Sequence, residues 1–144
     1  MIKNLYVSSS SNKVNKKRVH ELVGILRKEL NFSIGSLFIN LIDNDTIRKI
    51  NEEYLKHNYT TDIITFNYSG NHIVIDAEIF ISIEEAKQNA WKYKVSPGKE
   101  LTRLIIHGIL HLVGFDDIEA KDRIKMKKKE NNLLNKYNFS LLRK

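Results

Sequence analysis

One stretch decides the fold: Arg103-Leu104-Ile105-Ile106-His107-Gly108-Ile109-Leu110-His111-Leu112-Val113. A helix of this sequence is apolar nearly all the way round, which is typical of a buried helix. Ser96-Pro97 provides an N-cap and a first helical residue, and Gly114 permits the left-handed turn that ends a helix. We therefore expect a central helix with the other elements packed around it.

Two histidines on this helix form a candidate metal site. His107 and His111 lie at positions i and i+4, where Cβ atoms are about 5 to 6 Å apart on one face and two imidazoles can bind one ion. After the turn at Gly114 the chain can double back, so that Asp116 or Asp117 offers an oxygen. Three protein ligands leave a coordination position for water or substrate, as in catalytic sites. The alternative is a pair of hydrogen-bonded core histidines, although two unpaired imidazoles are costly to bury.

The composition limits the class of protein and of metal site. A chain of 144 residues with 42% hydrophobic and 28% charged residues is typical of one globular domain, residues 1–144. The absence of cysteine leaves only His, Asp or Glu to hold a metal. The net charge of +7 favours a polyanionic partner such as nucleic acid. Without a signal peptide or a long apolar segment, we expect a cytoplasmic protein with no membrane contact.

The order of expected elements predicts the fold class. Strands are expected at residues 2–7, 36–42, 62–68 and 73–82. Helices are expected around residues 19–30, 43–54, 82–93, 96–113 and 118–137. The turn at Ser69-Gly70-Asn71 predicts a hairpin of the last two strands. We interpret this order as a single α+β domain with one mixed β-sheet of about four strands packed with helices, and a metal-binding helix with a metzincin-like site in the core.

The residue after the first histidine distinguishes between substrate classes. Helical zinc proteases carry a glutamate there as general base, and this chain has Gly108. A glycine inside a helix costs roughly 1 kcal/mol, so it indicates a need for space or close approach. A phosphodiester substrate is compatible with a missing carboxylate, because a fixed negative charge would repel phosphate while a metal polarises the phosphoryl oxygen and supplies hydroxide. No side chain is assigned as general base, so the catalytic group would be metal-bound water.

The motif His107-Gly108-x-Leu110-His111-Leu112-x-Gly114-Phe115-Asp116 resembles the signature of the YbeY-type endoribonucleases, the bacterial ribosomal RNA maturation factors. Further segments resemble this family in the same order: Ile50-Asn51-x-x-Tyr54, Thr61-Asp62-Ile63-Ile64-Thr65-Phe66 and Glu78-Ile79-Phe80-Ile81-Ser82. The resemblance implies a zinc-dependent, single-strand-specific endoribonuclease with one Zn²⁺ per chain. It also implies a role in ribosomal RNA maturation, including the small-subunit 3′ end, and in ribosome quality control. The implied partners are single-stranded and ribosomal RNA and the ribosome or small-subunit proteins.

The third ligand departs from the family pattern. The family usually has a third histidine where this chain has Asp117, so His107 and His111 carry over directly and Asp117 by its position. A carboxylate oxygen is an acceptable zinc ligand. The resemblance therefore assigns His107, His111 and Asp117 to the metal, with Asp116 either supporting a ligand without touching the metal or serving as an alternative ligand.

A second departure concerns phosphate stabilisation. Leu55 stands where many family members have an arginine next to the active cleft, and Lys56, His57 and Arg103 are candidates to replace it. Arg103 lies one helical turn before His107 and could direct its guanidinium at a phosphate. The alternative for Arg103 is a structural salt bridge. His57 is either a third imidazole near the cleft or a solvated loop residue, and we favour the solvated residue.

The last expected helix is basic. Its run Lys125-Met126-Lys127-Lys128-Lys129 is either a solvated face or a path for RNA phosphates. Residues at packing spacing on this helix are Met126, Glu130, Leu133 and Leu134. The aromatic residues expected in the core are Phe66, Tyr68, Trp91 and Tyr93.

Two other functions fit parts of the sequence. A metallopeptidase-like hydrolase would explain the paired histidines, but Gly108 argues against it. A ribosome assembly or RNA-binding factor with a mainly structural metal would explain the missing arginine and the missing general base.

Overall fold

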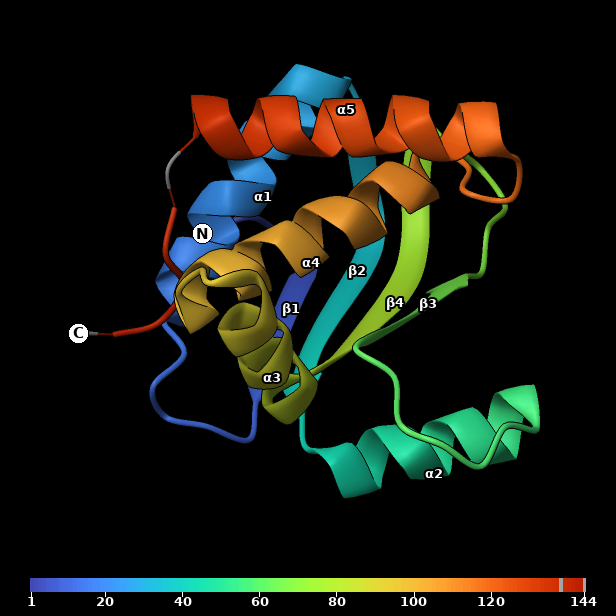
Figure 1. The fold of residues 1–144 in the computed structure, drawn as a ribbon. Helices are drawn as coiled ribbons and strands as arrows, with labels where there is room; N and C mark the ends of the chain where they lie inside the picture. Colours follow the sequence, from blue (N-terminus) through green and yellow to red (C-terminus); the bar gives the residue numbers. More distant parts are fainter. Residues whose placement is uncertain (138, 144) are drawn as a thin grey trace.

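The fold is a four-stranded sheet with five helices in the described chain (Figure 1). The computed structural model describes residues 1–137 and 139–143. The strands are β1 (Leu5–Ser9), β2 (Ser33–Ile42), β3 (Ile63–Asn67) and β4 (Val74–Ser82). The helices are α1 (Lys16–Leu30), α2 (Asn44–Leu55), α3 (Ile83–Tyr93), α4 (Pro97–Leu112) and α5 (Ala120–Lys136).

The sheet is mixed, with the strand order β1-β2-β4-β3. β1 and β4 both pair with β2 in parallel, and β3 is an antiparallel edge strand on β4. The segment from Tyr68 to Ile73 joins β3 to β4 and contains Gly70 at φ 64°, as the predicted hairpin requires. The predicted α+β fold with one mixed sheet is confirmed.

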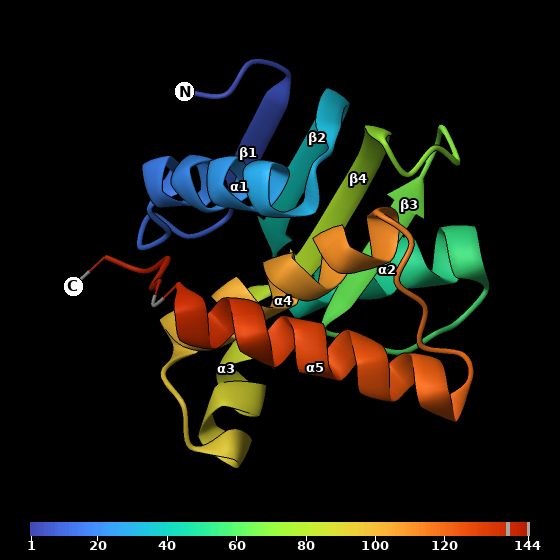
Figure 2. The ribbon, with the colours of Figure 1, turned by 90° about the horizontal axis from the view of Figure 1, so that it is seen from above.

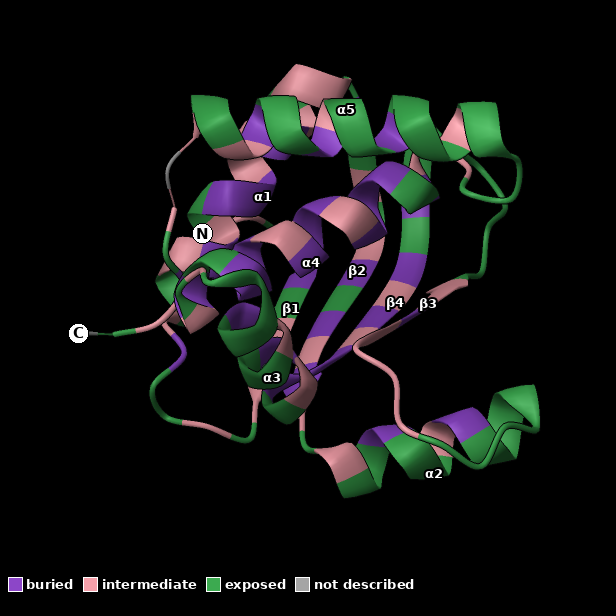
Figure 3. Ribbon diagram, in the orientation of Figure 1, coloured by how far each residue is buried: buried purple, intermediate pink, exposed green. Residues whose placement is uncertain are grey.

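Helix α4 is the central helix of the fold. It lies between the sheet and α5 (Figures 1 and 2), and most of its residues are buried (Figure 3). Its N-cap Ser96 accepts a hydrogen bond from the backbone N–H of Lys99, and Pro97 opens the helix. Both signals are visible in the sequence, so the start of this helix depends on local chemistry.

Gly108 allows α4 to approach the sheet closely. A Cβ atom at this position would lie 3.0 Å from Ile63 Cδ1 and 3.1 Å from Ile79 Cδ1. The sequence indicates close approach at this residue. The structure shows that the neighbours are side chains of β3 and β4, which would have to shift by a few tenths of an ångström to admit even a Cβ atom.

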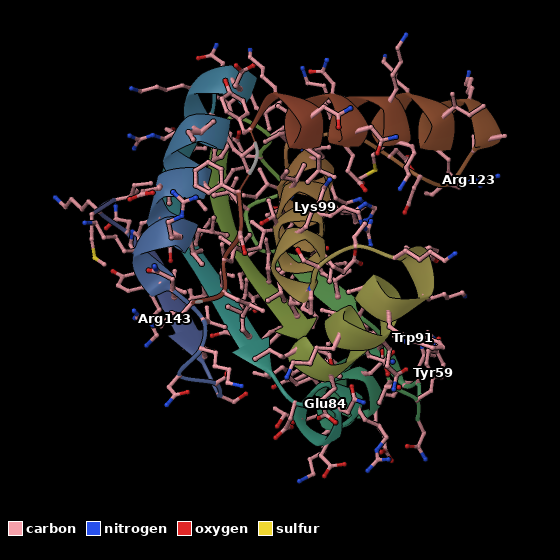
Figure 4. The ribbon with its side chains drawn as sticks, turned by 60° about the vertical axis from the view of Figure 1, so that its left-hand side comes forward. Tyr59, Glu84, Trp91, Lys99, Arg123 and Arg143 are labelled. Atoms are coloured by element: carbon pink, nitrogen blue, oxygen red, sulfur yellow. The ribbon has the colours of Figure 1, made fainter. Side chains whose placement is uncertain are left out.

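The first strand and the aromatic residues differ from the prediction. β1 begins at Leu5 because Asn4 adopts a left-handed conformation, at φ 67°, which interrupts an extended chain. The prediction that Trp91 and Tyr68 are core residues is wrong, since they are 86% and 64% exposed. Trp91 lies at the outside of the molecule (Figure 4). Tyr93 is exposed as well, and only Phe66 is half-buried. α3 buries Ile83, Ala86 and Ala90 on the opposite face, so its aromatic residues face outward.

Within the residues that the structure describes, no helix has the length and apolar character to cross a membrane.

Candidate functional site

The candidate site lies where α5 passes over the histidine-bearing face of α4. His107 is partly buried, and its Nδ1 atom lies 2.9 Å from Oε2 of Glu130 on α5. The side chain of Glu130 is only 2% exposed. His111, one turn further along α4, is exposed at the end of the helix. The structure therefore gives the two histidines different surroundings.

A second contact ties Glu130 to Arg103. Arg103 Nη1 donates to Glu130 Oε1 over 2.8 Å. The same guanidinium donates from Nε and Nη2 to the two carboxylate oxygens of Glu100, over 2.8 and 2.6 Å. Of the two roles considered for Arg103, the structure shows the salt bridge, with a geometry that satisfies two buried carboxylates at once.

The electrostatics of this network favour charged side chains. Burial alone raises the pKa of Glu130, but hydrogen bonds from His107 and Arg103 outweigh it and hold that pKa below its usual value. The hydrogen bonds to Glu100 raise the pKa of Arg103 above its ordinary value, against the effect of desolvation. Glu130 is therefore an ionised carboxylate, which can only accept hydrogen bonds.

A hollow of about 520 Å³ adjoins His107 and the first turns of α5. Its charged lining residues are Arg103, Asp117, Arg123, Lys127, Lys128 and Glu130. Arg123 lies near the N-terminal end of α5, at the edge of the molecule (Figure 4). These six side chains carry four positive and two negative charges, so a net positive charge remains beside His107, which favours an anionic ligand.

The two aspartates after the turn have different roles. Gly114, at φ 112°, turns the chain after α4. Asp116 Oδ1 then accepts from the backbone N–H of Ile118 over 2.7 Å, so this carboxylate stabilises the local turn. Asp117 is exposed and lines the hollow together with His107.

The donor chemistry of the histidines fits a metal ion. A carboxylate on Nδ1 leaves Nε2 of His107 free to bind a metal, the arrangement common among metal-ligating histidines. Among residues 1–137 and 139–143, however, no three His, Asp or Glu side chains converge closely enough to hold an ion. The assignment of His107, His111 and Asp117 to a metal therefore stays a prediction.

The residues around Leu55, which stands in place of the family arginine, line a separate, smaller hollow. Leu55 is 42% exposed and lines a cavity of about 270 Å³ with His57 and Thr65. His57 is exposed and stacks on Tyr59, with the ring centroids 5.1 Å apart. Lys56 ends α2 in a left-handed conformation, and its ammonium group lies 3.5 Å from the Glu53 carbonyl oxygen. The cations that line the same hollow as His107 come instead from α4 and α5.

Comparison with known proteins supports the resemblance seen in the sequence. A family profile described as Endoribonuclease YbeY matches residues 3–138. The chain belongs to the YbeY family. Endoribonuclease YbeY of Chlorobium limicola is 39% identical over 128 residues, which cover 85% of this chain and 88% of that protein. Endoribonuclease YbeY of Chlorobium phaeobacteroides is 42% identical over 110 residues, covering 76% and 77%.

The fold of this chain is also similar to that of a solved structure. A solution structure of a Thermotoga maritima protein superimposes with a TM-score of 0.62 at 26% sequence identity, covering 93% of this chain and 91% of the other.

Glu130 and Glu100 were not predicted as site residues from the sequence. Glu130 falls at a packing position between Met126 and Leu133. A glutamate in a buried stripe needs a partner, since an unpaired buried charge is costly. The packing position of Glu130 in the sequence could therefore have indicated a buried polar contact.

Proposed function

We propose that this chain is a zinc-dependent endoribonuclease that cuts single-stranded RNA. The proposal places it in ribosomal RNA maturation, including the small-subunit 3′ end, and in ribosome quality control, with ribosomal RNA and small-subunit proteins as partners. The observation that carries it is the contact of His107 with the buried Glu130 at the edge of a basic hollow. Membership of the YbeY family supports the reaction and the substrate class.

The side chains of the site have separate tasks in this proposal. His107 and His111 would hold the metal, and Asp117 is the candidate third ligand from the rim of the hollow. When bound, Zn²⁺ would polarise a phosphoryl oxygen and activate water for attack on phosphorus. Arg123, Lys127 and Lys128 attract the RNA backbone, because cations near phosphates release counterions.

An RNA-binding assembly factor with a mainly structural metal is the second candidate. It is favoured by Leu55 in place of the family arginine, and by the double salt bridge of Arg103, which occupies this guanidinium with carboxylates. In that case the basic hollow would bind RNA without cutting it.

A cleavage assay with chelator separates these functions. The full chain is incubated with labelled single-stranded RNA or with casein, with and without a zinc chelator, and circular dichroism is recorded on the same samples. We expect cleavage of RNA alone, lost with chelator and restored by zinc, while the helical signal persists. Intact RNA with bound zinc would favour the assembly factor, particularly if chelation unfolds the protein, and cleaved casein would indicate a peptidase.

Neutralising two lysines of the hollow is expected to weaken RNA binding in a salt-dependent way. For single-stranded RNA, each phosphate that the protein no longer neutralises lowers the slope of log K against log salt by about 0.7. Lys127→Gln with Lys128→Gln should therefore reduce the slope by about 1.4, measured by fluorescence anisotropy of a labelled RNA. Lys16→Gln with Lys17→Gln on α1 is the matched control, since both lysines are exposed away from the hollow. Equal slopes for the two double variants would exclude α5 as the RNA path.

A further inference from the structure

We propose that Glu130 is a positioning residue that holds neutral His107 as the tautomer with its proton on Nδ1, and so reserves Nε2 for a divalent metal ion. The inference rests on the proposed function only in naming the metal. Its structural part concerns a hydrogen bond within this chain.

The two oxygens of Glu130 have separate partners. Oε2 faces His107 Nδ1 at 2.9 Å, and Oε1 accepts from Arg103 Nη1 at 2.8 Å. Lys127 Nζ lies 3.5 Å from the same Oε1. A carboxylate between cations can only accept, so His107 must donate from Nδ1. In a neutral imidazole the other nitrogen, Nε2, then carries the free lone pair.

Arg103 keeps this carboxylate in place. Its other two donors bind Glu100, whose side chain is 2% exposed. Asn89 on α3 donates to Glu100 Oε2 over 3.3 Å. The contacts therefore run from α3 through α4 to α5 and end at His107. A side chain fixed by several buried partners can set the orientation of an imidazole better than a solvated one.

A glutamine at position 130 should reverse the tautomer. Its amide has one oxygen and one NH₂ group, while Arg103 and Lys127 have donors only. The amide oxygen therefore turns toward Arg103, and the NH₂ group faces His107. His107 must then accept at Nδ1 and carry its proton on Nε2, where the proton blocks a metal. A substitution of almost unchanged size would thus remove a ligand atom.

Glu100→Gln is the matched control. This variant also removes one negative charge from a buried carboxylate that binds Arg103. Glu100 accepts hydrogen bonds from Arg103 and Asn89 and has no hydrogen bond with His107 among the described residues. The tautomer of His107 should therefore stay as in the wild type.

The experiment measures the full-length protein without metal, by ¹⁵N NMR of the histidine rings at about pH 8.5, above the ordinary histidine pKa near 6.5. Zinc affinity is then measured by competition with a chromophoric chelator. We expect the Nδ1–H form in wild type and Glu100→Gln, and the Nε2–H form in Glu130→Gln. Zinc binding of Glu130→Gln should be about 10- to 100-fold weaker than that of wild type, the range for partners of metal ligands.

Several results would overturn the proposal. An Nε2–H form in the wild type does so without any variant, even if Glu130→Gln fails to fold. So does unchanged zinc affinity in a folded Glu130→Gln, or an equal loss in Glu100→Gln. RNA cleavage by the wild type is assayed separately. If RNA stays intact while the tautomer and the zinc affinity change as expected, the nuclease function fails and the role of Glu130 stands.

Discussion

Replacing His111 by alanine is expected to abolish the cleavage of single-stranded RNA and to weaken zinc binding by more than about 100-fold, beyond the range for partners of metal ligands. The loss of a direct ligand leaves His107 and one aspartate, too few for a tight zinc site. Because His111 is exposed at the end of α4, its removal opens no cavity in the core. The unfolding temperature of the metal-free protein should stay close to that of the wild type.

The measurement combines zinc content, RNA cleavage and thermal unfolding on the same preparation. His20→Asn on α1 is the control, because it removes an imidazole elsewhere but keeps an acceptor for the backbone N–H of Ile2. A His111→Ala protein that retains stoichiometric zinc and cuts RNA would refute the metal assignment. Zinc content of Asp117→Ala and Asp116→Ala then shows which aspartate is the third ligand.

Replacing Arg103 by alanine is expected to destabilise the metal-free fold by about 3 to 5 kcal/mol, the cost of removing one partner from a buried ion pair. Both carboxylates that bind Arg103 have side chains only 2% exposed. Without the guanidinium, the partners left among the described residues are His107 and Lys127 for Glu130, and Asn89 for Glu100. The free energy of unfolding in urea at about pH 7 measures this loss.

The effect of Arg103→Ala should decrease at acid pH. The lowered pKa of Glu130 contributes stability above the pKa of the unfolded carboxyl, and this stability is lost as the pH falls through the folded value. Since part of it comes from Arg103, the difference in unfolding free energy between wild type and variant should be full at about pH 7 and should narrow as the pH falls below about 4.3, the ordinary pKa of glutamate.

The control for this variant is an exposed ion pair. Arg48→Ala removes the pair with Asp45, whose atoms are 3.1 Å apart on the surface of α2. It should cost less than about 1 kcal/mol. Similar losses for Arg48→Ala and Arg103→Ala would show that the buried network contributes little to stability.

Local signals in the sequence predicted the elements of the fold well. Ser96-Pro97 and Gly114 bracket α4, and Gly70 lies in the turn between β3 and β4. Each acts on backbone within a few residues, so no knowledge of the fold is needed. The prediction that the aromatic residues of α3 lie in the core is wrong, because their exposure depends on which face of the helix meets the core. The sequence alone does not specify that face when small residues are the ones buried.

The candidate site was only partly predictable for a similar reason. His107 and His111 share one helix face through their spacing alone. The sequence does not decide the role of Arg103, because a guanidinium beside a histidine can bind either a phosphate or a carboxylate. The structure places Glu100 and Glu130 against it.

The sequence by itself determined the buried helix α4, its pair of histidines and the membership of the YbeY family, because helical spacing and motif order act along the chain. Only the tertiary structure decided what touches His107. Glu130 lies 23 residues further along the chain in a lysine-rich helix, at a packing position that indicates burial but does not say which group it contacts. Its contact with His107 exists because α5 packs across α4 and buries a carboxylate that must then find donors.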